Sequence, residues 1–181
     1  MRYCDKIKSI SNKKLFLVVN VDWFFLSHRL PIALAALKEG YNITIVAKDT
    51  GRKKEIESCG LRFIDFPFER SGVDPFHEVK CIFLLYRLYR KNHPDIIHHV
   101  TLKTALLGCL AAKVAGQKHV VNAISGWGYN FTEGRDGIKQ KIVKQMMKMA
   151  FKSRSFHYIF QNPDDVSQFS QLGYVRTNSL D

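Results

Sequence analysis

Acidic, basic and aromatic side chains gather in residues 20–29, immediately after an apolar run. The candidate ligand-binding side chains there are Asp22, Trp23, Phe24, His28 and Arg29. We expect Ser27 to cap a helix, so that free backbone N–H groups and a cation face the same ligand, an arrangement that favours an anion. In the alternative interpretation, Ser27 only caps the helix and Arg29 is solvated.

A second candidate segment, residues 98–103, begins with two adjacent histidines. Neighbouring residues of a strand point to opposite faces, so His98 and His99 do not form a chelating pair, and one of them should face a ligand. We take His99 as that residue. An imidazole and the Thr101 hydroxyl suit sugar hydroxyl groups, and Lys103 at a helix start suits a phosphate. The alternative is a core histidine, with Thr101 as a helix cap.

The third candidate segment alternates glycines with large aromatic side chains. Its candidate site residues are Ser125, Gly126, Trp127 and Tyr129. Glycine lets the backbone approach a ligand closely, and indole and phenol rings can stack on a sugar ring. The alternative is a mobile surface loop, although bulky aromatic side chains between glycines are costly to expose.

The elements that must position these segments alternate along the chain. Apolar runs predict strands at 15–19, 43–47, 61–66, 95–99, 119–124 and 156–160. Helical spacing and capping residues predict helices at 27–40, 52–58, 76–92, 103–115, 138–152 and from 162 onward. In the helix 76–92 we expect Val79, Phe83 and Tyr86 to begin the apolar stripe. Arg90 takes the next position, so the stripe should shift sideways through Leu85, Leu88 and Tyr89. We therefore predict an α/β fold: a Rossmann-like, doubly wound parallel sheet of at least six strands, with helices on both faces.

In such a sheet the ligand site lies at the carboxyl ends of the strands, which is where all three candidate segments fall. The 181 residues are enough for one domain. We expect residues 1–12 to be a tail and residues 13–181 to be that domain. No GxGxxG motif follows a strand, so we expect no nicotinamide or flavin cofactor. The four cysteines form no CxxC pair, and we expect no metal site.

Charge points to an anionic partner. The net charge is +12, which fits nucleic acid, anionic lipid or a phosphate-bearing substrate, but no nucleic-acid-binding signature is present. The helix 138–152 carries Lys139, Lys141, Lys144, Lys148 and Lys152 and no acid. Such a face is either simply solvated or contacts anionic lipid, and the missing acids favour lipid. From the sequence we expect neither a signal peptide nor a membrane span.

The three candidate segments, followed by 160–165 (FQNPDD), resemble the N-terminal domain of family 4 glycosyltransferases. The nearest subgroup assembles bacterial polysaccharides, O-antigens and lipid-linked glycans. The resemblance covers the chain from Lys14 to the end. The order of the motifs supports it more strongly than any single motif does. Asp164 and Asp165 are better explained as part of a helix start than as a metal-binding Asp-x-Asp motif.

The resemblance implies the acceptor-side half of a GT-B enzyme, in which two Rossmann-like domains face each other across a cleft. Such enzymes retain stereochemistry and need no metal or other cofactor. The donor, here expected to be a UDP-sugar, binds mainly to a second domain that also carries paired glutamates. We therefore assign no catalytic residue within residues 1–181 and expect this chain alone to be inactive.

The resemblance also implies a lipid-linked saccharide as acceptor, with no nucleic acid partner. We expect the protein to be cytoplasmic and to associate peripherally with the anionic inner face of the plasma membrane. Two alternatives stay open at this point. One is a non-catalytic α/β module that binds anions, and the other is a sugar-nucleotide epimerase of GT-B shape.

Overall fold

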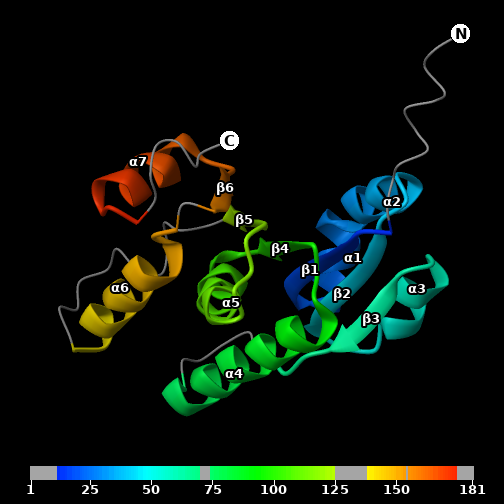
Figure 1. Ribbon diagram of the computed structural model, residues 1–181, viewed down its shortest axis with the longest axis horizontal. Helices are drawn as coiled ribbons and strands as arrows, with labels where there is room; N and C mark the ends of the chain where they lie inside the picture. The colour runs from blue at the N-terminus through cyan, green and yellow to red at the C-terminus, as the bar shows by residue number, and fades with distance from the viewer. Residues whose placement is uncertain (1–11, 70–73, 125–137, 154, 175–181) are drawn as a thin grey trace, which may run out of the picture.

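The computed structural model describes residues 12–69, 74–124, 138–153 and 155–174, with backbone alone for 138–143 (Figure 1). Within these residues one parallel sheet has the strand order β3-β2-β1-β4-β5-β6. Its strands are β1 (Lys14–Val21), β2 (Asn42–Lys48), β3 (Arg62–Asp65), β4 (Ile96–Val100), β5 (Val120–Ile124) and β6 (Phe156–Phe160). The order reverses between β1 and β4, where ligands bind in doubly wound folds. The predicted six-stranded parallel sheet is confirmed.

Helices cover both faces of the sheet. They are α1 (Asp22–His28), α2 (Leu30–Lys38), α3 (Lys53–Ser58), α4 (Pro75–Asn92), α5 (Leu102–Val114), α6 (Ile138–Phe151) and α7 (Pro163–Gln171). The Asn162 side chain accepts a hydrogen bond from the Asp164 backbone N–H, 3.0 Å away, and Pro163 opens α7. The predicted helix start at 162–165 is therefore confirmed. Among the described residues no helix is long and apolar enough to cross a membrane.

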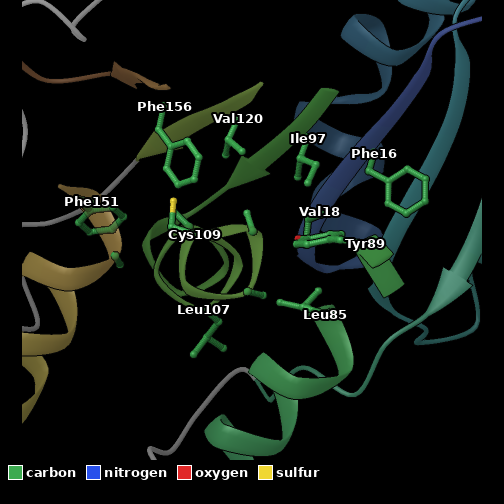
Figure 2. Close-up of a cluster of buried hydrophobic side chains, with 14 of the residues drawn as sticks. Phe16, Val18, Leu85, Tyr89, Ile97, Leu107, Cys109, Val120, Phe151 and Phe156 are labelled. Carbon is green, nitrogen blue, oxygen red and sulfur yellow. The ribbon is translucent and has the colours of Figure 1, made fainter. Parts of the chain in front are cut away.

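Alternation along β1 divides the core between the two faces. Leu15, Leu17 and Val19 pack with side chains of α1, α2 and α3, whereas Phe16 and Val18 pack with those of α4, α5 and α6. Figure 2 shows the second cluster, in which Phe16, Val18 and Ile97 of the sheet lie near Leu85 and Tyr89 of α4. Burial on both faces explains why the strands are continuous apolar runs in the sequence.

The predicted helix 27–40 is wrong in its start and in its continuity. The chain enters α1 at Asp22, directly after β1, and breaks at Arg29 before α2. Ser27 caps no helix: its hydroxyl donates to the Trp23 carbonyl one turn earlier, at 2.9 Å. The proline at position 31 falls in the first turn of α2, where its missing N–H costs nothing.

The predicted apolar stripe of α4 is wrong at Val79 and Phe83 but right at Leu85 and Tyr89. The buried side chains are Glu78, Cys81, Leu85 and Tyr89, whereas Val79 is 64% and Phe83 is 55% exposed. The helix carries apolar residues on two sides, and the buried side includes an acid. Glu78 is tolerated there because Lys103 Nζ lies 2.6 Å from its Oε1.

Candidate functional site

Asp22 joins the end of β1 to the loop that follows β2. Its fully buried carboxylate accepts hydrogen bonds from the Thr50 backbone N–H (2.6 Å), the Thr50 hydroxyl (2.6 Å) and the Arg52 backbone N–H (3.1 Å). The backbone N–H of Trp23 donates a fourth, at 2.7 Å. Burial alone would raise the pKa of Asp22, but these bonds outweigh it and lower the pKa. In this arrangement Asp22 positions loops at the carboxyl edge of the sheet.

The outer side of α1 carries an aromatic group. The Phe24 and His28 rings are stacked, with centroids 4.4 Å apart and planes at 14°, and Trp23 meets Phe24 edge-on at 6.1 Å. The Ser27 hydroxyl lies 2.6 Å from His28 Nδ1. Trp23 is 37% exposed, so part of its indole ring is accessible to a ligand.

Arg29, between α1 and α2, lies near His98 of β4. Burial and, to a lesser extent, the Arg29 charge together lower the pKa of His98 to about 4, so His98 is neutral at pH 7. Among the described residues, the buried atoms Arg29 Nε and His98 Nε2 have no hydrogen-bond partner. Unpaired buried polar atoms are rare in folded proteins, so we take Arg29 Nε and His98 Nε2 as candidate ligand contacts.

His99 points to the opposite side of β4 and is fully buried. Asn122 Oδ1 lies 2.8 Å from its Nδ1, and the Tyr89 hydroxyl lies 2.9 Å from its Nε2. Because Asn122 Oδ1 can only accept, Nδ1 donates and Nε2 accepts from Tyr89. The Cys109 thiol donates to the same Asn122 oxygen, at 3.1 Å. His99 therefore ties β4 to β5 and α4 inside the core.

The expected placement of His99 at an exposed ligand site is corrected by this network. Strand alternation predicts that one histidine of the pair faces a ligand, but it does not say which one. His98, which the candidate set lacks, is the histidine beside Arg29. Burial lowers the pKa of His99 to about 4 as well, against the opposing hydrogen bond to Asn122, and the ring is neutral at pH 7.

Thr101 bridges the ends of three strands. Its hydroxyl donates to Asn20 Oδ1 at 3.0 Å at the end of β1, and its backbone N–H donates to the Ala123 carbonyl of β5 at 3.0 Å. Its backbone has φ 85° and ψ 155°, a region populated almost only by glycine. Strained residues of this kind concentrate at functional sites, and this one lies where the strand order reverses.

Replacing Thr101 with glycine is expected to leave the free energy of unfolding unchanged or to raise it. Relief of strain of about 1–3 kcal/mol outweighs the loss of one hydrogen bond of about 1 kcal/mol. The control is Thr104→Gly, which loses the bond from the Thr104 hydroxyl to the Val100 carbonyl and places glycine in a helix, and should cost about 2 kcal/mol. Urea unfolding of both variants checks this, and an equal loss in both would show that Thr101 is unstrained.

Lys103 is engaged with the protein itself. Besides Glu78, its ammonium group donates to the Glu69 carbonyl at 2.8 Å. The other oxygen of Glu78, Oε2, is buried without a hydrogen-bond partner among the described residues. A phosphate at Lys103 would therefore compete with Glu78 for the ammonium group.

The remaining candidates, Ser125, Gly126, Trp127 and Tyr129, lie outside the described residues. They follow Ile124, the last residue of β5. The described chain thus brings Arg29 to His98 and Thr101 to Asn20 at the carboxyl side of β1 and β4. Within the described ranges, no three His, Cys, Asp or Glu side chains are grouped so that they could hold a metal ion.

Comparison with known families gives one match that covers most of the chain. The model of the glycosyl transferase 4-like family matches residues 14–162. A glycosyltransferase structure from Rickettsia africae superimposes with a TM-score of 0.64 at 16% identity, covering 94% of this chain and 42% of that one. The fold is therefore that of one half of a GT-B glycosyltransferase, as predicted.

Two relatives are named for the glycans they extend. UDP-Gal:alpha-D-GlcNAc-diphosphoundecaprenol alpha-1,3-galactosyltransferase from Escherichia coli is 28% identical over 110 residues, which are 61% of this chain and 27% of that protein. N,N'-diacetylbacillosaminyl-diphospho-undecaprenol alpha-1,3-N-acetylgalactosaminyltransferase from Campylobacter jejuni is 25% identical over 161 residues, covering 82% of this chain and 42% of that protein. This chain thus spans less than half the length of either relative.

Proposed function

Because this chain belongs to the glycosyl transferase 4-like family, we propose that it forms the acceptor-side half of an enzyme that transfers a sugar from a UDP-sugar to a lipid-linked saccharide. The observation that carries the proposal is the shared acceptor class of the two relatives. Both are named for a saccharide on diphosphoundecaprenol, although they transfer different sugars. Both names also specify an alpha-1,3 linkage, which supports a retaining reaction.

The described residues can supply what acceptor binding requires. Transfer needs an acceptor hydroxyl held close to the reacting carbon of the donor. Arg29 offers a half-buried cation whose buried Nε is unpaired among the described residues, and neutral His98 offers an unpaired ring nitrogen near it. We propose that this pair binds the polar part of the acceptor, with the Trp23 and His28 rings at its border. We keep Ser125, Gly126, Trp127 and Tyr129 as proposed contacts on the loop that follows β5.

The donor would bind elsewhere. The two relatives extend well beyond the region that this chain matches. We propose that transfer requires a donor-binding half of that kind, and that stabilisation of the departing diphosphate comes chiefly from it. On this proposal residues 13–181 form the acceptor domain and 1–12 a tail, and the chain alone neither transfers sugar nor binds UDP-sugars tightly.

A lipid-linked acceptor places the reaction at a membrane. The net charge of +12 favours an anionic surface, such as the inner leaflet of the plasma membrane. We propose that the protein associates peripherally with the cytoplasmic side of that membrane. The acceptor would then be reached laterally within the bilayer.

The test is a transfer assay on a polypeptide that joins residues 1–181 to a donor-binding half. Radiolabelled UDP-sugars serve as donors, and a saccharide on diphosphoundecaprenol serves as acceptor. The proposal predicts label in the lipid extract. Conversion of the donor into its epimer, with no label in the lipid, would contradict it and favour an epimerase.

A further inference from the structure

Helix α4 turns an apolar stripe away from the core. Phe76 is 87% exposed, Val79 is 64% and Phe83 is 55%. Spacings of three and four residues place these side chains on one side of a helix. Single exposed apolar residues are ordinary, but a row that includes two phenylalanines is a candidate contact surface.

Basic side chains surround this stripe. Lys80, Arg87, Arg90 and Lys91 are exposed on the same helix, and the Arg87 guanidinium lies 5.9 Å from the centre of the Phe83 ring. The only acid within Pro75–Asn92 is Glu78, which is buried and paired with Lys103. The outer face of α4, defined here by the three apolar and four basic side chains just named, therefore carries no acid. Aromatic and cationic side chains without acids are the pattern of helices that lie in the surface of an anionic bilayer.

A groove beside the outer face gives the cations a place to hold a phosphate. It runs between α4 and the residues that follow β3, and its lining includes Arg87, Arg90 and Lys91. Asp65 also lines it, and one oxygen of its carboxylate accepts the Asp49 backbone N–H at 2.9 Å. Three cations around one groove suit an anionic lipid headgroup.

The outer face begins near the carboxyl edge of the sheet. The Phe76 end of α4 follows the loop that leaves β3, and Glu78 pairs with Lys103 in the first turn of α5. Figure 1 shows α4, α5 and α6 on the same side of the sheet. The Phe76 end of the stripe therefore lies near the edge at which a lipid-linked acceptor would have to arrive.

Helix α6 matches this pattern less well than its lysines suggest. Lys144 and Lys148 are exposed, but Met149, at 52%, is the one large apolar side chain exposed in the part of α6 whose side chains are described. Met147, Ala150 and Phe151 are buried against the domain. The part of α6 with described side chains, 144–151, can therefore attract anions but offers little apolar area to insert.

We propose that the outer face of α4, rather than α6, is the surface by which this protein docks on an anionic phospholipid bilayer. Phe76, Val79 and Phe83 enter the headgroup and acyl boundary, while Arg87 and Arg90 contact lipid phosphates. The proposal rests on the proposed function, because a lipid-linked acceptor requires the site to approach a membrane. Its evidence is independent of that function.

The test is co-sedimentation of the 181-residue chain with vesicles of phosphatidylglycerol and phosphatidylcholine that contain no glycolipid. The double change Arg87→Gln and Arg90→Gln should weaken binding about thirtyfold at moderate salt. The double change Phe76→Ser and Phe83→Ser should weaken it about tenfold or more. The matched control is Lys144→Gln with Lys148→Gln on α6, which removes the same charge and should weaken binding less than about threefold. All replaced side chains are exposed, so melting temperatures should stay equal.

The outcomes separate this inference from the proposed function. Three results would each overturn the inference. They are no vesicle binding by the natural chain, a loss of vesicle binding from the α6 changes as large as that from the α4 changes, and α4 changes that dissociate a dimer without weakening vesicle binding. If the chain binds vesicles through α4 but binds no lipid-linked acceptor, the proposed function fails and the docking surface stands. If it binds a water-soluble acceptor analogue but no vesicles, the docking surface fails and the function stands.

Discussion

Replacing Gly108 with alanine is expected to destabilise the chain by about 1–3 kcal/mol, although glycine to alanine within a helix normally stabilises by about 1 kcal/mol. An added Cβ would lie 2.1 Å from His99 Nε2. The ring cannot move aside, because Tyr89 and Asn122 hold both of its nitrogens. Urea unfolding followed by circular dichroism measures the change.

A double-mutant cycle tests the cause. His99→Ala alone should cost about 2–4 kcal/mol, because it leaves a cavity and unpaired groups on Tyr89 and Asn122. In the double variant the new methyl group enters the space that the ring vacated. The stability loss of the double variant should therefore be smaller than the sum of the two single losses by about 1 kcal/mol or more. Additive losses, or a more stable Gly108→Ala variant, would show that the ring and helix are not in close contact.

The second large effect is expected at Asp22. Asp22→Ala should lower the free energy of unfolding by about 2–4 kcal/mol, because the N–H groups of Thr50 and Arg52 lose a charged acceptor in a buried place. Asp74→Ala is the control. Asp74 is exposed and accepts one capping bond, from the Phe76 backbone N–H at 3.1 Å, so its loss should cost only about 1 kcal/mol.

The Asp22 contribution should depend on pH in a definite direction. Its folded pKa lies below the ordinary value of 3.8, so the ionised form stabilises the fold above that pH, and the stabilisation is lost as the pH falls through the folded pKa. The difference in unfolding free energy between the natural chain and Asp22→Asn should therefore be constant above about pH 5 and shrink below about pH 4. A difference that stays constant down to pH 2 would contradict the assigned hydrogen bonds.

The sequence predicts the sheet well because a strand buried on both faces is a continuous apolar run, which is easy to recognise. The five central residues of β1, for example, are all buried, and no polar residue interrupts them. The helix 138–152 was predicted to within one residue of α6, and the start of α7 follows from the Asn162 cap and the proline after it. These features depend on local composition alone.

The site was predicted less well, because its details depend on tertiary contacts. No local sequence pattern shows that the Asp22 carboxylate accepts hydrogen bonds from the loop after β2. Helix α1 begins at Asp22, so Ser27 lies inside a helix and not at its start. Which of His98 and His99 enters the core depends on Asn122, 23 residues after His99, and on Gly108 in the helix that follows β4. The buried side of α4 depends on Lys103, which neutralises Glu78.

The central claim is that this chain is an acceptor-binding half, and calorimetric titration of residues 1–181 tests it most directly. One titrant is a short-chain analogue of a saccharide on a lipid diphosphate, and the other is a panel of UDP-sugars. We predict binding of the acceptor analogue, weakened about tenfold or more by Arg29→Gln, and no micromolar binding of any UDP-sugar. Micromolar binding of a UDP-sugar, without binding of the acceptor analogue, would contradict the claim.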